Sequence, residues 1–573
     1  MSLQGITVAV SPSGASYFAQ VLLANKIAAA LTNITVPNNT INVPDIMLSS
    51  YKGTSDWAKH ITISLQSGSL SGFNPTFTSL TQGDGGQFTM VLTASNFKVD
   101  YMWNEQYDEE ECSFTCSKTG HVNNTYYYSV GIGTMTISIV FQFEYANNAW
   151  ALTLISATPT PTDLTPNIPS GSIVNQQDYA GCFKTTASDA TKQAVETIDF
   201  GPVIQQAVSP AFGSIPSTGK LTPQITFNFP MGPSGLNFPN DSGIAAGVTG
   251  DTTFNGTEYP GTNPPQLALP PIPTTNHLQY YASDYTFNSL FWAFYESGLL
   301  VATATPANVP DPAALNTSNY QNTPLQALYN AYPNTPMTAD ITATAAPTVT
   351  FAQIYDLTSL NLPKLQSQLP TAVYTSLQAL SGQVYMNEAD FFQALENALG
   401  QQNADQYKTV IEGVALVVGA VVTHSIQVVL NVISGGQTVP VITFDVAETD
   451  VLQAFVLGVA GTTQTLQFQF QIVQPLTSTQ FVSSTIPGVS SADWSFIYNW
   501  VLQPVFADEV AKMGENGVAL PRVTGFNFLF TGATITLQPG YAAVLTDVQY
   551  VSDTGVAYLA SKRVAAAAAS AGD

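Results

Sequence analysis

Hydrophobic and polar residues alternate with a period of two in several stretches of the chain. Every second residue is large and apolar in residues 88–92, 135–143 and 466–472. Successive side chains of a strand point to opposite faces, so this period is that of a strand with one apolar and one polar face. We therefore expect long strands whose apolar faces together line an interior.

The end of the chain shows a helical period followed by strand periods. From Trp494 to Met513 apolar residues recur every three to five positions, which places them on one face of a helix. N-cap residues precede this segment, and Gly514 and Gly517 follow it. Residues 526–530 and 535–537 then alternate, which predicts two strands after the helix.

The chain repeats one plan twice. The first half begins with a strand at residues 6–10 and a helix from Pro12, and it ends with a helix expected over residues 188–212. The second half has a strand at residues 278–282 and a helix from Asp284, and the Trp494 helix closes it. Long strands lie between the helices of each half, which predicts a structural duplication.

This plan predicts an α+β fold of two tandem barrel-like domains, each a long curved antiparallel sheet wrapped on two helices. The N-terminal tubular domain is expected at residues 1–215. Residues 216–275 are rich in Pro and Gly and are expected to form an ordered linker without regular elements. The C-terminal tubular domain is expected at residues 276–555, with a helical insertion near 355–406. An Ala-rich tail fills residues 556–573.

The charge of the chain limits its partners. Lys and Arg number 14 and Asp and Glu number 38, which gives a net charge of −24. Nucleic-acid binding needs clustered cations, so no nucleic-acid partner is expected. The same charge argues against electrostatic capture of anionic membranes or lipopolysaccharide. Only 9% of the residues are charged, and the low charge density leaves self-association possible.

Three cysteines allow one disulfide and one free thiol. In a secreted protein we expect the disulfide to join Cys182 to Cys112 or to Cys116. His121 would complete at most a three-ligand set with Cys112 and Cys116, so no metal site is expected. Glycosylation sequons occur at Asn33, Asn38, Asn123, Asn240, Asn255 and Asn316.

The sequence leaves two compartments open. Met1 leads almost directly into the strand at residues 6–10, so no signal peptide is visible. The sequons and the weakly charged surface favour a secreted protein or one of the secretory lumen, and a cytosolic protein remains the alternative. The most apolar stretch, residues 410–433, is interrupted by polar residues, and no transmembrane segment is expected.

The chain lacks the sequence signatures of common enzymes. There is no G-x-S-x-G, H-E-x-x-H, P-loop or Rossmann glycine pattern. The histidines at 60, 121, 277 and 424 are expected to be isolated from one another. The acidic residues 105 and 108–111 lack the spacing of a calcium loop and are expected in a solvated loop. We therefore expect neither an enzyme nor a cofactor other than bound lipid.

Short motifs at the ends of both halves resemble those of one family. Residues 5–8 and 13–17 resemble the N-terminal start, and residues 281–288 with 298–300 resemble the opening of the second domain, of the bactericidal/permeability-increasing and lipopolysaccharide-binding protein family. That family includes the plasma phospholipid and cholesteryl-ester transfer proteins. Residues 499–505, 517–521, 537–539 and 548–550 are similar to its C-terminal end.

The resemblance implies an elongated boomerang, with a central sheet joining the domains and an apolar pocket in each that holds a lipid acyl chain. It also implies a disulfide between a strand and the second helix of the first domain. The residues expected to line the pockets are Tyr17, Phe18, Val21, Leu22, Val203, Ile204, Val208, Tyr285, Phe287, Phe291, Phe294, Trp494, Ile497, Tyr498, Val501 and Val505.

Three functions follow from this reasoning. The first is binding or transfer of a phospholipid or another acyl lipid, driven by burial of the acyl chain. The second is innate-immune binding of bacterial lipopolysaccharide, which the acidic net charge disfavours. The third is a structural protein that assembles through its weakly charged surface, with its pockets closed by its own side chains.

Overall fold

The chain forms two compact units. The computed structural model describes residues 2–550 apart from 4, 32–33, 147–148, 176–179, 209–217, 221, 229–234, 239–242, 262–266, 269–271, 273–274, 308, 310, 359–360, 461–464, 494–496, 498–517 and 520–527. We call Pro12–Ile215 with Phe238–Ile244 the N-terminal unit. Met1–Ser11, Pro216–Asn237 and Ala245–Asp573 form the C-terminal unit.

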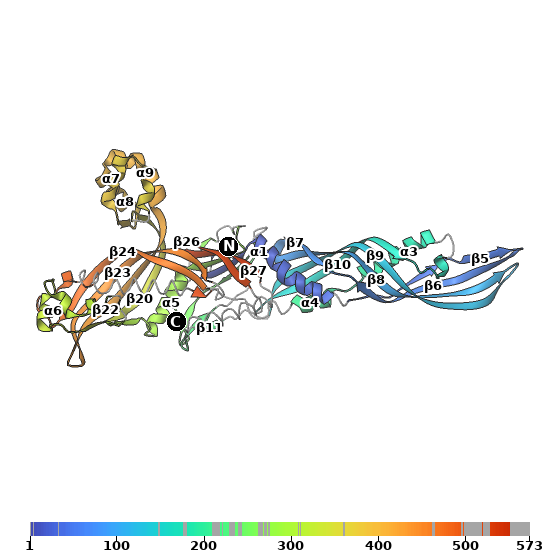
Figure 1. Cartoon of the computed structure of the whole chain (residues 1–573), viewed down its shortest axis with the longest axis horizontal. Helices are drawn as coiled ribbons and strands as arrows, with labels where there is room; N and C mark the ends of the chain where they lie inside the picture. The colour runs from blue at the N-terminus through green and yellow to red at the C-terminus, as the bar shows by residue number, and fades with distance from the viewer. Residues whose placement is uncertain are drawn as a thin grey trace, which may run out of the picture. The chain divides into compact units, whose positions relative to one another are not determined.

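The N-terminal unit is built on an eight-stranded antiparallel sheet (Figure 1). Its four long strands follow the order β10-β9-β8-β6, and the short strands pair with β6 or β8. The long strands are β6 (Thr54–Ser71), β8 (Gln87–Cys112), β9 (Cys116–Ala146) and β10 (Ala149–Asn167). The short ones are β3 (Thr35–Val36), β4 (Asn39–Val43), β5 (Ile46–Tyr51) and β7 (Thr76–Gln82).

Two sets of helices cover this sheet. The first begins at Pro12, as predicted, and runs through α1 (Pro12–Phe18), the π-helical η1 (Ala19–Ala24) and α2 (Asn25–Leu31). The second set is α3 (Ala180–Glu196) and α4 (Gly201–Val208). The expectation of one helix over residues 188–212 is wrong, because the helix is interrupted at residues 197–200. There the Asp199 side chain accepts a hydrogen bond from the Gly201 amide, 2.9 Å away, and α4 begins.

The C-terminal unit contains a seven-stranded and a six-stranded sheet, and the long strands of both pair antiparallel. The seven-stranded sheet has the order β19-β20-β22-β23-β24-β25, with β21 paired to β20. Its strands are β19 (Val301–Ala304), β20 (Met337–Asp356), β21 (Val384–Tyr385), β22 (Leu416–Ser434), β23 (Gln437–Ala460), β24 (Thr465–Ser484) and β25 (Val518–Ala519).

The six-stranded sheet joins the beginning of the chain to its end. Its order is β13-β14-β2-β18-β27-β26, so β18 lies between β2 and β27. The strands are β2 (Ile6–Val10), β13 (Leu236–Asn237), β14 (Ile244–Val248), β18 (Leu278–Ser283), β26 (Phe528–Gln538) and β27 (Tyr541–Tyr550). The two strands expected at 526–530 and 535–537 are wrong as separate elements. The described residues of both segments, 528–530 and 535–537, fall on β26, whose register to β27 shifts between Thr531 and Thr534.

Residues 216–275 also hold regular structure, so the expectation of a linker without strands is wrong. Four short strands form a sheet in the order β11-β12-β15-β16, and β17 pairs with β1. Backbone hydrogen bonds between short segments are compatible with the high Pro and Gly content, because those residues fall mostly outside the strands. The strands are β1 (Ser2–Leu3), β11 (Thr218–Lys220), β12 (Ile225–Asn228), β15 (Thr252–Phe254), β16 (Thr257–Glu258) and β17 (Leu267–Ala268).

The helices of the C-terminal unit fall into two groups. The first is α5 (Asp284–Glu296), which packs on β20, with η5 (Pro312–Leu315), η6 (Thr317–Tyr320) and α6 (Gln326–Ala331). The second lies between β20 and β22 and has an apolar core of its own around Phe391 and Leu395 (Figure 1). It contains η7 (Leu362–Leu365), α7 (Thr371–Leu377), η8 (Gln378–Leu380), α8 (Glu388–Leu399) and α9 (Gln401–Ala415).

The predicted fold class, with long antiparallel sheets packed on helices, is confirmed. The strand orders of the two longest sheets are open rather than closed. The Trp494 helix lies outside the described residues except for Ile497, which is helical and completely buried. Among the helices that the structure describes, none has the length and apolar character needed to cross a membrane.

Candidate functional site

The inner face of the N-terminal sheet forms a continuous buried row on each long strand. On β8 this row runs from Phe88 to Tyr107, a distance of roughly 65 Å for an extended strand. Side chains of β6, β9 and β10 join the same core, and residues of α2, α3 and α4 cover it. The β8 row contains Phe88, Met90, Leu92, Ala94, Phe97, Val99, Tyr101, Trp103, Glu105 and Tyr107.

The row changes parity in the middle of the sheet. Even-numbered residues of β8 face the core up to Ala94, and odd-numbered residues face it from Phe97 onward. Asn96 lies at this change with φ of 54°, and on β10 Asp163 has φ of 55°. Between them on β9 lies Gly133, where a Cβ atom would come within 2.7 Å of the Asp163 Cβ. Asn96 on β8 and Asp163 on β10 have left-handed backbone, and Gly133 lies between them on β9. Together they let all three strands change, at the same level of the sheet, which residues point to the core.

This change divides the interior into two chemically different halves. Before it the inner side chains are aliphatic or phenyl, as in Met90, Leu92, Ile137, Ile139 and Phe141. After it apolar residues such as Val99 and Val130 alternate with side chains that carry polar atoms at their tips: Tyr101, Trp103, Glu105, Tyr107, Tyr126 and Tyr128. The interior is therefore hydrocarbon-like on one side and mixed on the other.

Glu105 is fully buried in the mixed half. Its carboxylate accepts hydrogen bonds from the Ser172 hydroxyl and from the Ile173 amide, whose nitrogen lies 3.1 Å from Oε1. The expectation that this residue lies in a solvated loop is wrong. The acidic residues 105 and 108–111 all lie in β8, and the alternation of the strand turns Glu105 inward.

Burial raises the pKa of the tyrosines in this half. The pKa values of Tyr101 and Tyr128 rise because their hydroxyls are desolvated. Burial also raises the pKa values of Tyr107 and Tyr126, and the nearby Glu105 carboxylate adds to both increases. These phenols therefore stay neutral over the physiological pH range.

The predicted pocket residues of the N-terminal unit occupy different environments. Val203 packs against the core and Ile204 is completely buried in it. Tyr17, Phe18 and Val21 are half-buried, and the ring centroids of the first two are 6.4 Å apart. The side chains of Leu22 and Val208 lie outside the described part of the structure.

The predicted residues of the C-terminal unit are spread over three clusters. Phe287 and Phe291 pack with Val349 and Phe351, and Phe294 packs with Ile225 and Trp292. Tyr285 is half-buried and donates a hydrogen bond of 2.5 Å to Asp251. Ile497 lies in the core between β20, β22 and β23. Trp494, Tyr498, Val501 and Val505 lie outside the described residues.

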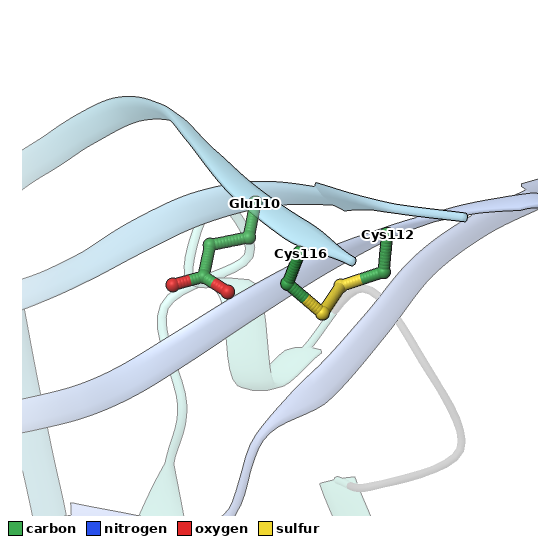
Figure 2. A group of neighbouring side chains, drawn as sticks. All are labelled: Glu110, Cys112 and Cys116. Atoms are coloured by element: carbon green, nitrogen blue, oxygen red, sulfur yellow. A yellow bond between two sulfur atoms is a disulfide. The ribbon is translucent and has the colours of Figure 1, made fainter. Parts of the chain in front are cut away.

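The disulfide joins Cys112 to Cys116, so the expectation of a bond to Cys182 is wrong. The two cysteines are cross-strand partners at the end of the β8–β9 hairpin, with Cα atoms 4.0 Å apart (Figure 2). The hairpin register brings them together across a short turn. Cys182 lies near the start of α3.

Two aromatic side chains are exposed at this end of the sheet. Phe114, between the bonded cysteines, is fully exposed, and Tyr51 in the β5–β6 turn is 69% exposed. The two turns are neighbours, because Ser55 pairs with Cys112. We call the turns at residues 51–54 and 112–116 the hairpin tip. Exposed rings on adjacent turns are a feature of surfaces that contact apolar partners.

Two lysines near the hairpin tip, Lys59 and Lys118, are paired with acids. Lys59 Nζ lies 3.0 Å from Glu110 Oε2, and Lys118 Nζ lies 2.5 Å from Asp108 Oδ1. Asp108 also accepts from His121 Nδ1 at 2.7 Å, and His60 Nδ1 lies 3.6 Å from the same carboxylate. A hydrogen bond from Lys118, and to a smaller extent one from His121, lowers the pKa of Asp108 to about 2. The expectation that the histidines are isolated from one another is wrong for His60 and His121, which lie at the same carboxylate.

Two groups of described residues bring potential metal ligands together. Glu110 lies beside Cys112 and Cys116 (Figure 2), but sulfurs joined in a disulfide offer no thiolate to a metal. In the C-terminal unit, His424 Nε2 lies 3.1 Å from Asp450 Oδ2 and 3.9 Å from Glu448 Oε2. This second group offers nitrogen and oxygen ligands from cross-strand neighbours on β22 and β23.

A shallow hollow of about 350 Å³ lies where α4 meets β10. A bulge between Leu154 and Ser156 turns Ile155 toward solvent. Gln205 of α4 bonds to the free edge of β10: its Oε1 accepts from the Leu154 amide at 2.8 Å. The hollow is therefore a polar surface feature and is separate from the apolar interior. Its lining residues are 154–157, 199, 201, 202 and 205.

The sequons have different surroundings. Asn123 and Asn255 are exposed, and so is Asn38, whose side chain accepts a hydrogen bond from the Ser67 amide. Asn316 is half-buried, and its side chain caps η6 by accepting from the Ser318 amide. Asn33 and Asn240 lie outside the described residues.

The sequence alone did not predict the mixed half of the interior, with its buried tyrosines, Trp103 and Glu105. Its signal is present in the printed sequence, because residues 97–107 alternate with a period of two. The pattern starts on the opposite parity from residues 88–94, so it does not read as a continuation of the first strand. A run that keeps its period but changes parity indicates one strand with a bulge.

Comparisons with known proteins agree with this architecture. Residues 247–373 match the family described as "LBP / BPI / CETP family, C-terminal domain". A search of curated proteins gives no match to the chain. The structure is similar to the crystal structure of lipopolysaccharide binding protein, with a TM-score of 0.50 and 12% identity over 96% of this chain and 100% of that one.

Two further solved structures are similar at lower TM-scores, one to nearly the whole chain and one to part of it. P47 from Clostridium botulinum A2 has a TM-score of 0.25 and 9% identity over 95% of this chain and 97% of that one. Takeout 1 from Epiphyas postvittana has a TM-score of 0.14 and 11% identity over 29% of this chain and 72% of that one. Residues 247–373 therefore match the C-terminal domain of the LBP/BPI/CETP family, and the chain shares its fold with lipopolysaccharide binding protein.

Proposed function

We propose that the protein binds and carries acyl lipid and is not an enzyme. The observation that supports this function best is the buried row of β8 and its neighbours, which gives the N-terminal unit a long apolar interior. Its aliphatic half offers a hydrocarbon surface of Met, Leu, Ile and Phe, and separate helices, α2, α3 and α4, cover the interior. The match of residues 247–373 to the LBP/BPI/CETP family supports the same function.

The energy for such binding comes from the acyl chain. Each methylene removed from water contributes about 0.8 kcal/mol. About a dozen methylenes would contribute on the order of 10 kcal/mol before the cost of association. Retention therefore needs no cationic head-group site, and we infer loose selectivity among phospholipid-like head groups.

The hairpin tip favours an uncharged or zwitterionic lipid surface as the source of the lipid. Lys59 and Lys118 are held in ion pairs with Glu110 and Asp108, so at the tip itself the exposed Lys52, which lies over the Tyr51 ring, is left to meet an anionic head group. Lipopolysaccharide capture through a cationic tip is accordingly disfavoured. We propose a secreted protein, in line with the disulfide in the exposed hairpin tip.

Lipid that remains with the purified protein tests this proposal. Native mass spectrometry of the full chain should show a protein-bound mass, and organic extraction should release an acyl lipid of the same mass. The control is the same preparation incubated with an excess of empty phosphatidylcholine vesicles, which should exchange the bound lipid. A protein without bound lipid that also takes up no fluorescent acyl probe would refute the proposal.

Phe114 should matter for contact with the lipid surface and not for retention. Burying an exposed phenylalanine side chain contributes about 2 kcal/mol, so Phe114→Ala should weaken binding to phosphatidylcholine vesicles roughly 10-fold or more. Co-sedimentation with vesicles measures this. Ile155→Ala removes a half-exposed apolar side chain elsewhere in the same unit and serves as the matched control. Equal binding by both variants would contradict the role of the tip.

A further inference from the structure

Four groups that can donate a hydrogen bond are buried in the N-terminal unit without a hydrogen-bond partner among the described residues. They are the hydroxyls of Tyr101, Tyr128 and Thr191 and the indole Nε1 of Trp103. Each of these side chains is at most 1% exposed. Buried donors are nearly always satisfied in native proteins by protein, water or ligand. Four such groups in one region therefore call for a bound polar atom.

These groups belong to one cluster of packed rings. Tyr101 and Tyr128 are cross-strand partners on β8 and β9, and their rings stack with centroids 6.2 Å apart. The Trp103 ring meets Tyr128 edge-on at 4.9 Å. The Thr191 hydroxyl on α3 lies near enough to counter part of the rise in the Tyr128 pKa, but the two do not meet hydrogen-bond geometry. The three rings thus form one cluster, which α3 contacts through Phe183 and Thr191.

The residues around these donors favour an uncharged hydrogen-bond acceptor. Val99, Val130 and Ile132 flank the rings, and Phe183 of α3 packs on Trp103 with centroids 5.5 Å apart. The Glu105 carboxylate lies two residues after Trp103 on the same face of β8 and is fully buried. A second anion in this apolar region would be repelled by Glu105 and would also lose its hydration. An uncharged acceptor fits better.

We propose that Tyr101, Trp103 and Tyr128 form a subsite for the uncharged carbonyl oxygen of a bound acyl ester. The indole N–H can only donate, and a carbonyl oxygen can accept two hydrogen bonds. The ester would lie in the mixed half of the interior, and its hydrocarbon chain would extend along the aliphatic half. This inference rests on the proposed lipid-binding function and adds recognition of one functional group inside the unit.

Three probes of equal chain length test the subsite on the full-length, delipidated protein. They are a long-chain methyl ester, the alkane and the free fatty acid at pH 8. The test variant is the double substitution Tyr101→Phe and Tyr128→Phe, which removes two hydroxyls and keeps both rings. Tyr127→Phe, on the exposed face of β9, is the control. An ester labelled with carbon-13 at the carbonyl also reports hydrogen bonding by its infrared stretching frequency.

The wild type should bind the fatty acid anion less tightly than the ester, because Glu105 repels the anion. It should bind the ester more tightly than the alkane, by about 5-fold for each hydroxyl that bonds the ester. The double variant should lose this preference and shift the carbonyl stretch to higher frequency, and Tyr127→Phe should do neither. Equal binding of ester and alkane by the wild type, as when water satisfies the donors, would overturn the subsite while leaving lipid binding intact. A preference kept by the double variant, or fatty acid binding as tight as ester binding, would also overturn it. If no probe binds, the proposed function itself fails.

Discussion

Replacing Glu105 by alanine should lower the free energy of unfolding of the N-terminal unit by about 3 kcal/mol. The Ser172 hydroxyl and the Ile173 amide both donate to this carboxylate in a fully buried place. Removing the acceptor leaves two buried donors unpaired, and hydrogen bonds to a buried charged group contribute about 1.5–3 kcal/mol each. The segment after β10 should also loosen, because these two bonds fasten it to β8.

Urea unfolding of the full chain measures this loss, with amide exchange in β8 and β9 peptides as the reporter of the N-terminal unit. Glu111→Ala on the same strand is the matched control, since Glu111 is exposed, and its effect should stay within about 0.5 kcal/mol. Glu105→Gln keeps one acceptor oxygen and should lose less than Glu105→Ala. Equal effects of Glu105→Ala and Glu111→Ala would show that the buried carboxylate is not a structural anchor.

The sequence predicts the strands of this unit better than it predicts its interior. The alternation in residues 88–92 and 135–143 is local, so it predicts β8 and β9 and the inner faces of their aliphatic halves. The change of parity at Asn96 needs matching irregularities on β9 and β10. Those matches depend on register, and the sequence of one strand does not contain the register of its neighbours.

The same reason explains the errors about pairs of residues. Cys112 and Cys116 meet because a hairpin turns between them, and His60 meets His121 at Asp108 because β6 and β9 both flank β8. Each contact follows from strand pairing and not from spacing along the chain. Thr191 lies more than sixty positions from Tyr128 in the sequence, and only the packing of α3 on the sheet places them together. Composition and period predict what is buried, and topology decides what buried groups can do.

Removal of bound lipid should destabilise the N-terminal unit by about as much as the loss of Glu105. A ligand that binds only the folded state and is present at about 100 times its Kd stabilises that state by about 2.7 kcal/mol. The inner residues of β8 and β9 are the ones that would lose contacts, so their amides should exchange faster after delipidation. Exchange in α8 and α9, which have a core of their own, should not change.

Hydrogen exchange on the lipid-bound, delipidated and reloaded protein tests this expectation. Reloading with a long-chain lipid should restore protection of β8 and β9, and a lipid of the same head group with much shorter chains should restore less, because each methylene contributes about 0.8 kcal/mol. If chain length made no difference, the head group would carry the affinity and the aliphatic half of the interior would have no role in binding. If delipidation left exchange unchanged throughout, the residues of the β8 row would be packed against the protein's own side chains, and the interior would be a structural core.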